Sequence, residues 1–129
     1  MSHHGRVYFN ELNTWDPDAA KTYYGAVFGW SFVETPTAGT DNQRPYHIAK
    51  IGDDVVAGMF TMVSPHFDGI PDHWFTYLAV DDLDAAIKTS DSAGGKVTRP
   101  PFVIPDFGRM AVVAGPTGAY QAFFQPADD

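Results

Sequence analysis

Two matching segments decide the fold: Asp16-Pro17-Asp18-Ala19-Ala20 and, 66 positions later, Asp82-Leu83-Asp84-Ala85-Ala86. Aspartate is a preferred helix N-cap, proline suits the first helical position, and a second aspartate complements the helix dipole. The same shift places Gly29 on Gly95 and Leu12 on Leu78. Because these positions start, cap and end a strand–helix unit, we infer an internal duplication.

Strand-like stretches surround each predicted helix. In the first half we predict a helix that begins at Pro17 and stops at Gly29, a loop over 35–45, and strands over 6–12, 30–34, 46–51 and 55–60. In the second half we predict a helix that begins at Leu83 and stops at Gly94-Gly95, a proline-containing loop over 100–108, and strands over 74–80, 96–99, 110–114 and 119–124. The order strand, helix, three strands therefore occurs twice. We expect one α+β domain over residues 1–129, made of βαβββ modules at 6–62 and 73–126 with a linker at 63–72.

Composition excludes several classes of function. The chain has 129 residues and a formal net charge of -8, which argues against binding to nucleic acid or to anionic membranes. No apolar run approaches the roughly 20 residues that a membrane-spanning helix needs. There is no cysteine, and the first residues contain no apolar signal region. We expect a cytoplasmic protein.

The motifs in both halves resemble the vicinal-oxygen-chelate superfamily of glyoxalases, bleomycin resistance proteins and dioxygenases. The segments that carry the resemblance are 15–21, 28–30, 73–74, 79–86, 93–95 and 108–119. Within that superfamily the chain is similar to one half of the actinobacterial antigen-type glyoxalase-like proteins, which are often named hydroxylases. The resemblance implies mixed sheets curved into an open bowl that holds a small molecule, and it implies a homodimer.

In metal-dependent members, each module supplies one metal ligand from its first strand and one from its last. Carried onto this sequence, those positions fall on Phe9, on Phe75, on Ala122, and on Ala57 or Gly58. A phenyl ring or a methyl group has no lone pair to donate to a divalent cation. We therefore expect no metal cofactor at the usual site. A metal held by relocated ligands, Glu11, His47 and His73, is the open alternative.

Without the usual ligands, the implied bowl becomes a candidate ligand pocket. Strand side chains alternate, so an inward Phe9 implies that Glu11 and Asn13 also point inward. The residues that we expect to line the pocket are Phe9, Asn13, His47, Met59, Phe75, Tyr77, Phe102, Arg109, Ala122 and Phe124. The loop over 100–108 would form a stiff wall, because its three prolines restrict the chain.

Two residues are candidates for catalysis. Glu11 is a general base or a ligand anchor in one interpretation and a partnered strand-end residue in the other. His73 is an acid or base at the pocket rim, or an exposed loop histidine. Arg109 could pair with an anionic ligand or form a surface salt bridge. The three tryptophans could stack on a planar ligand or form core and dimer contacts.

These observations predict a protein that binds a small organic molecule without the usual metal. The alternative is a lactoylglutathione lyase-like or dioxygenase-like enzyme that uses relocated metal ligands or Glu11 as a general base. No phosphate loop or dinucleotide motif is present, because no helix follows either glycine-containing hairpin turn. The sequence does not name a substrate.

Overall fold

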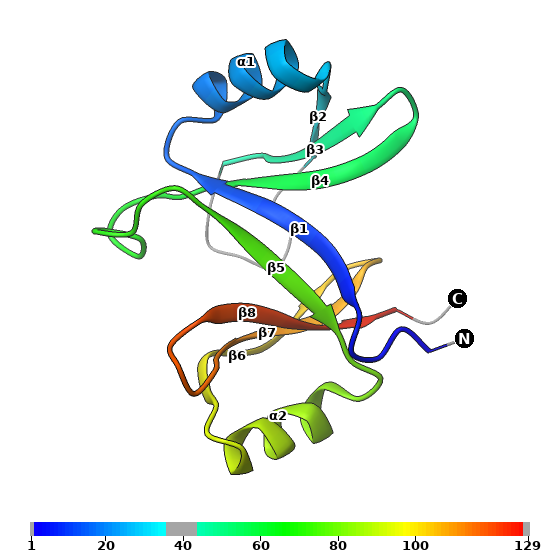
Figure 1. Cartoon of the computed structure of the whole chain (residues 1–129), viewed down its shortest axis with the longest axis vertical. Helices are drawn as coiled ribbons and strands as arrows, with labels where there is room; N and C mark the ends of the chain where they lie inside the picture. The colour runs from blue at the N-terminus through cyan, green and yellow to red at the C-terminus, as the bar shows by residue number, and fades with distance from the viewer. Residues whose placement is uncertain (1, 36–43, 128–129) are drawn as a thin grey trace. The chain divides into compact units, whose positions relative to one another are not determined.

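The computed structural model describes residues 2–35 and 44–127, and the predicted loop over 35–45 lies mostly outside them. Within the described residues the chain forms eight strands and two helices (Figure 1). In order these are β1 (Val7–Thr14), α1 (Pro17–Phe28), β2 (Ser31–Thr35), β3 (Tyr46–Ile51), β4 (Asp54–Thr61), β5 (His73–Ala79), α2 (Leu83–Ser92), β6 (Lys96–Ile104), β7 (Gly108–Ala114) and β8 (Tyr120–Pro126). Neither helix of the described chain is long and apolar enough to cross a membrane.

The chain divides into two compact units, residues 10–74 and residues 1–9 with 75–129. The strand order is β2-β3-β4-β1 in the first unit and β5-β8-β7-β6 in the second. In each unit the first strand pairs in parallel with the last, and the other neighbours are antiparallel. The α+β class and the repeated βαβββ order are therefore confirmed.

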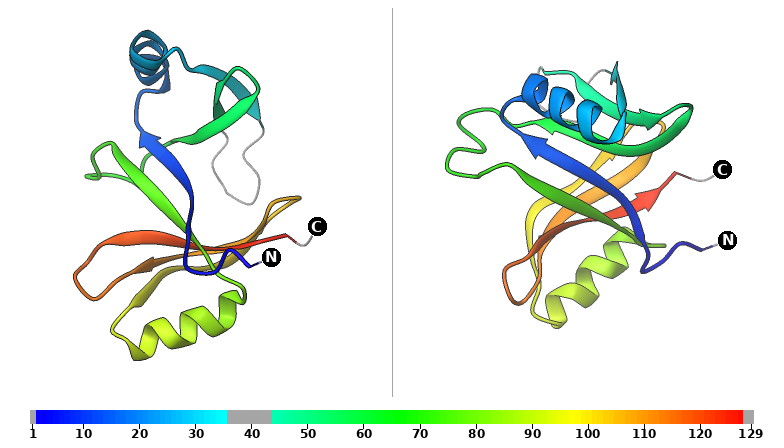
Figure 2. Two further views of the ribbon diagram at one scale, coloured as in Figure 1. Left: turned by 45° about the vertical axis from the view of Figure 1, so that its right-hand side comes forward. Right: turned by 45° about the horizontal axis from the view of Figure 1, so that its top comes forward.

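Each helix packs on one face of its own four strands. Helix α1 contacts β2 and β4, and α2 contacts β6, β7 and β8. The arrangement of α2 beside its strands can be followed in both views of Figure 2. Because one face of each sheet carries a helix, successive side chains along a strand alternate between the helix-covered face and the face without a helix.

The helix caps form as the sequence predicts. The Asp16 carboxylate accepts a hydrogen bond from the Ala19 N–H at 3.0 Å, and Gly29 ends α1 in a left-handed conformation with φ 72°. Asp82 accepts from the Ala85 N–H at 3.1 Å. Helix α2 ends at Ser92 with Ala93 as its C-cap, just before the glycine pair at 94–95 that was predicted to stop it.

The predicted loop over 100–108 is wrong for most of its length. Strand β6 continues through Pro100 and Pro101 to Ile104, and only residues 105–107 form the turn to β7. Proline cannot donate to a strand ladder, but β6 is the edge strand of its unit and is bulged there. Between Arg99 and Phe102 the strand has one residue more than β7, so the ladder passes over the prolines.

The second unit shows the alternation of faces most clearly. Met110, Ala122 and Phe124 pack in one buried cluster, while Ala111 lies in another with Leu83 of α2. Neighbouring residues on one strand thus pack in different buried clusters, one on each face of the sheet. Complete burial of a leucine such as Leu83 contributes about 1.5–3 kcal/mol to stability, so this apolar contact helps to hold α2 on its sheet.

Candidate functional site

The strand side chains of unit 10–74 lie on two opposite faces of its sheet. Leu12 lies beside Ala19 and Ala20 of α1, and Met59 is the register partner of both Leu12 and His47. These side chains therefore belong to the helix-covered face. Glu11 and Asn13 alternate with Leu12 and so lie on the opposite face. We call this surface, made by Glu11, Asn13, Tyr46 and Phe60, the helix-free face.

Glu11 is a buried carboxylate with a short hydrogen bond. Its side chain is 5% exposed, and the Tyr46 hydroxyl donates to its Oε1 at 2.7 Å. The two residues come from β1 and β3, which are separated by one strand, β4. A carboxylate held by a hydroxyl at low exposure can bind a ligand's donor group or accept a proton.

Asn13 and His73 form a second polar pair. The Asn13 Nδ2 lies 3.0 Å from the His73 Nε2, and the His73 Nδ1 lies 2.8 Å from the Pro71 carbonyl oxygen. Because a carbonyl only accepts, His73 donates from Nδ1 to Pro71, and Nε2 is then the acceptor for the asparagine amide. The Asn13 Oδ1 is buried and has no hydrogen-bond partner among the residues described. This oxygen is an available acceptor for a ligand.

His47 lies on the other face, which corrects its expected place in the pocket. Its Nε2 is 3.4 Å from Glu34 Oε1, and Lys21 of α1 lies 3.9 Å from the same oxygen. Burial lowers the pKa of His47 and the charge of Lys21 lowers it further, while Glu34 acts in the opposite direction. Met59 shares this helix-covered face and is fully buried.

This placement also separates the proposed relocated metal ligands. His47 points toward α1, whereas Glu11 lies on the opposite side of the same sheet, so the set of Glu11, His47 and His73 does not assemble. No group of three histidine, aspartate or glutamate side chains that could hold a metal occurs within residues 2–35 and 44–127.

In the second unit, the predicted aromatic positions come together as a packed cluster. Phe75, Ala122 and Phe124 are buried, with Tyr77 and Phe102 packed against them. The Phe9 ring meets Tyr77 edge-on at a centroid distance of 5.7 Å.

Arg109 is on the opposite face of that unit from the aromatic cluster. Its neighbour Met110 belongs to the cluster, and its guanidinium lies 3.5 Å from the exposed carboxylate of Asp84 on α2. The expectation that Arg109 lines the pocket is therefore corrected to the alternative of a surface salt bridge. Such exposed pairs contribute little to stability.

The strand register settles the one position that the sequence left open in the metal site implied by the family resemblance. Tyr77 pairs with Ala122, and its repeat equivalent Glu11 pairs with Gly58, so Gly58 rather than Ala57 matches Ala122. The four positions are then Phe9, Gly58, Phe75 and Ala122. None of these side chains has a lone pair, so this donor set does not fit a divalent cation.

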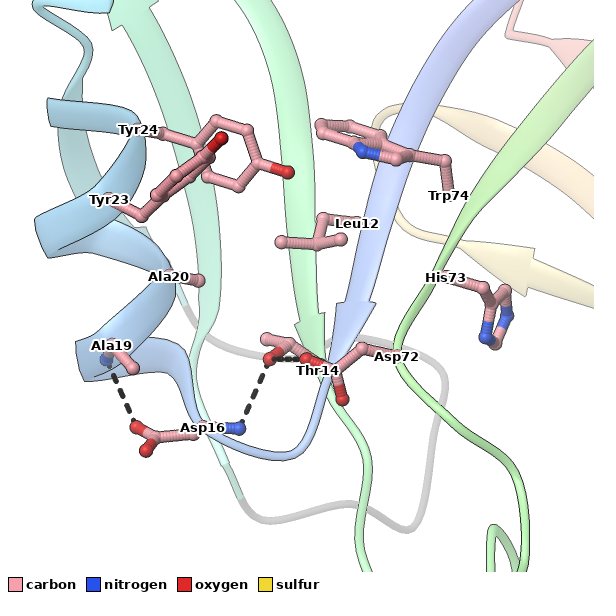
Figure 3. A pocket seen from close by; sticks show the side chains of 10 residues that line it. All are labelled: Leu12, Thr14, Asp16, Ala19, Ala20, Tyr23, Tyr24, Asp72, His73 and Trp74. Carbon is pink, nitrogen blue, oxygen red and sulfur yellow. Dashed lines mark hydrogen bonds between the residues drawn. The ribbon is translucent and has the colours of Figure 1, made fainter. Parts of the chain in front are cut away.

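A groove beside α1 was not predicted from the sequence. It is an open groove within unit 10–74 with a volume of about 380 Å³ (Figure 3). Its lining residues are Leu12, Thr14, Asp16, Ala19, Ala20, Tyr23, Tyr24, Asp72, His73 and Trp74. Two aromatic residues at consecutive helix positions, Tyr23 and Tyr24, were the available signal in the sequence. The Trp30 ring stacks on Tyr24 at 5.1 Å.

Comparison with known proteins gives one family. The model of the Glyoxalase/Bleomycin resistance protein/Dioxygenase superfamily matches residues 6–123. The Mycobacterium tuberculosis protein named "Putative glyoxylase CFP32" is 39% identical over 123 residues, which are 95% of this chain and 45% of the relative. The "Anthracycline biosynthesis protein DnrV" of Streptomyces peucetius is 33% identical over 119 residues, covering 84% of this chain and 42% of that protein. The chain thus spans less than half the length of these curated relatives.

Solved structures agree on the fold. Methylmalonyl-CoA epimerase from Mycobacterium tuberculosis superposes with a TM-score of 0.67 at 16% identity, covering 99% of this chain and 92% of that one. The Mn(II)-bound glyoxalase from Novosphingobium aromaticivorans superposes with a TM-score of 0.64 at 19% identity, covering 97% of this chain and 40% of that one. At such low identity these structures establish the fold only.

Proposed function

The chain belongs to the Glyoxalase/Bleomycin resistance protein/Dioxygenase superfamily, and from that premise we propose that its helix-free face binds a small organic molecule without the superfamily's usual metal. One observation carries the proposal. The inherited ligand positions hold Phe9, Gly58, Phe75 and Ala122, while the neighbouring position Glu11 holds a buried carboxylate bound to Tyr46 at 2.7 Å. The four side chains at these positions cannot ligate a metal, but Glu11 and Tyr46 are polar groups that could bind a ligand.

The polar groups define what the ligand must offer. Glu11 accepts hydrogen bonds, and Asn13 Oδ1 is a second acceptor that lacks a partner among the residues described. A buried acceptor without a partner costs about 1–3 kcal/mol, which a ligand donor would recover. Phe60 and Ile48 add apolar surface on the same face. We infer a ligand with an apolar body and a hydroxyl or amine donor.

The test measures ligand-induced thermal stabilisation with and without a chelator. A panel of aromatic hydroxyl and amine compounds, thiol conjugates and antibiotic-like molecules is screened against the wild type in EDTA. We expect at least one class to raise Tm, and Glu11→Gln to weaken its binding at least about tenfold, since a charge-assisted hydrogen bond contributes roughly 1.5–3 kcal/mol.

Glu34→Gln is the matched control, because Glu34 lies in the same unit on the helix-covered face. It should leave ligand affinity unchanged. The proposal would be contradicted by a panel with no stabilising class, or by stabilisation that EDTA abolishes and a divalent ion restores.

A second candidate function is enzymatic, with Glu11 as a general base. Its low exposure and its bond to Tyr46 give a carboxylate of the kind that proton-transfer enzymes use. The measurement is turnover of the glutathione hemithioacetal of methylglyoxal by the chelator-treated protein. Activity that Glu11→Gln eliminates and Glu34→Gln retains supports this function, and inactivity of the wild type rejects it for that substrate.

A further inference from the structure

The groove beside α1 has two chemically different ends. Tyr23, Tyr24 and Trp74 line one end, and Thr14, Asp16 and Asp72 line the other, with Leu12 between them (Figure 3). The groove lies on the helix-covered side of unit 10–74, opposite the helix-free face described above, and His73 lines the groove while also contacting Asn13 of that face.

The aromatic end is rigid yet exposed. The Tyr24 ring is held edge-on to Trp74 at 5.7 Å and stacks on Trp30 at 5.1 Å. Tyr23 and Trp74 nevertheless remain 59% and 44% exposed. Rings that are fixed by neighbours and still accessible can stack on an aromatic ligand without a large loss of side-chain entropy.

The acidic end carries two carboxylates whose hydrogen-bond donors within residues 2–35 and 44–127 are all neutral groups. Asp72 accepts from the Trp15 N–H at 2.9 Å and from the Thr14 hydroxyl, and Asp16 accepts from the Ala19 N–H at 3.0 Å. These donors orient the carboxylates but leave their negative charge in place. Carboxylate oxygens can accept more than one hydrogen bond each, so both groups could bind a further donor.

The surrounding charges favour a cation. None of the described residues that line the groove is lysine or arginine. Both ring nitrogens of His73 are engaged elsewhere, with Asn13 and with the Pro71 carbonyl. The positive end of the α1 dipole lies nearby, but Asp16 and Asp18 in the cap and first turn oppose it.

We propose that this groove binds an arylalkylamine, with its ring against Tyr23 and Trp74 and its ammonium group at Asp16 and Asp72. The volume of about 380 Å³ lies within the range of roughly 300–1,000 Å³ that small-molecule sites occupy. The apolar floor at Leu12 and Ala20 corresponds to the short alkyl chain that joins the ligand's two parts.

The experiment compares three probes that differ only in their polar end: phenethylamine, phenethyl alcohol and phenylacetate. Binding is followed by NMR through the indole N–H of Trp74, identified with Trp74→Phe. We expect the amine to shift this signal with at least tenfold higher affinity than the alcohol. Phenylacetate should not bind, because the two carboxylates repel it.

Variants then test the acidic end. Asp16→Asn keeps the helix cap and Asp72→Asn keeps one oxygen acceptor, while each removes a charge. Together they should weaken amine binding about tenfold and leave alcohol binding unchanged. Asp53→Asn, in the exposed β3–β4 turn, removes the same charge elsewhere and should have no effect. Should the double variant fail to fold, Asp16→Asn alone and the loss of amine affinity in 1 M NaCl give the same information.

Three results would overturn the proposal. One is equal affinity for the alcohol and the amine. Another is amine binding that Glu11→Gln abolishes and the two aspartate variants leave intact, which assigns the amine to the helix-free face. The third is the absence of any shift at Trp74, for instance because a second copy of the chain covers Tyr23 and Trp74. A negative result for amine binding in the groove does not contradict the proposed function at Glu11, because a separate variant tests that site.

Discussion

Glu11 and His47 are ionisable residues buried in the same unit, but their environments differ. Glu11 receives the Tyr46 hydroxyl at 2.7 Å, which stabilises a carboxylate. His47 is 2% exposed and its Nδ1 has no hydrogen-bond partner in the part of the chain described. Glu34 and, more weakly, Asp18 favour its charged form, but burial and the charge of Lys21 outweigh them. Burial without full compensation therefore makes His47 the residue at which acidity should destabilise the fold.

The pH dependence follows from the lowered pKa of His47. The unfolded chain binds a proton near pH 6.5, before the folded chain does, so the free energy of unfolding should fall as the pH drops below about 6.5. The slope is at most about 1.4 kcal/mol per pH unit. Urea unfolding at pH 7.5 and 5.5, followed by circular dichroism, measures it. His47→Gln should flatten the dependence, and His66→Gln, at an exposed position, should not. Parallel curves for wild type and His47→Gln would refute this role.

At the scale of elements, local interactions determine where the helices begin, whereas pairing with another strand determines how far β6 extends. The caps at Asp16 and Asp82 depend on residues three positions away, so the sequence predicts them directly. Pro100 and Pro101 predict a loop by the same local rules, but β6 is an edge strand, and a bulge in its pairing with β7 accommodates them. A rule based on local sequence fails here because it does not include pairing with a strand that is distant in the sequence.

The caps give a second stability prediction. Asp16→Ala and Asp82→Ala should each lower the free energy of unfolding by about 1 kcal/mol, because a helix N–H loses its acceptor. Asp16→Asn should be nearly neutral. Asp53→Ala serves as the control for loss of charge at an exposed turn. Urea denaturation at constant pH measures all four, and equal stability of Asp16→Ala and wild type would show that the cap is dispensable.

At the scale of the whole molecule, we propose from the family resemblance that the chain forms a homodimer. Exposed apolar side chains, including Val27, Phe28 and Phe107, provide surface that a partner could cover. Light scattering after size exclusion should then give twice the 14.1 kDa mass of the chain. A mass of 14.1 kDa at high protein concentration would exclude it.

The sequence by itself determined the duplicated βαβββ order and the helix caps, because both depend on short-range geometry. It also states the residue types Phe9, Phe75 and Ala122 at positions where the family resemblance implies metal ligands. Only the tertiary structure decided that Gly58 is the fourth such position, that Glu11 meets Tyr46, and that Asn13 meets His73. It also decided that His47, Met59 and Arg109 face helices. The physical reason is register: a strand's faces alternate every residue, so hairpin length and pairing determine which side chains meet.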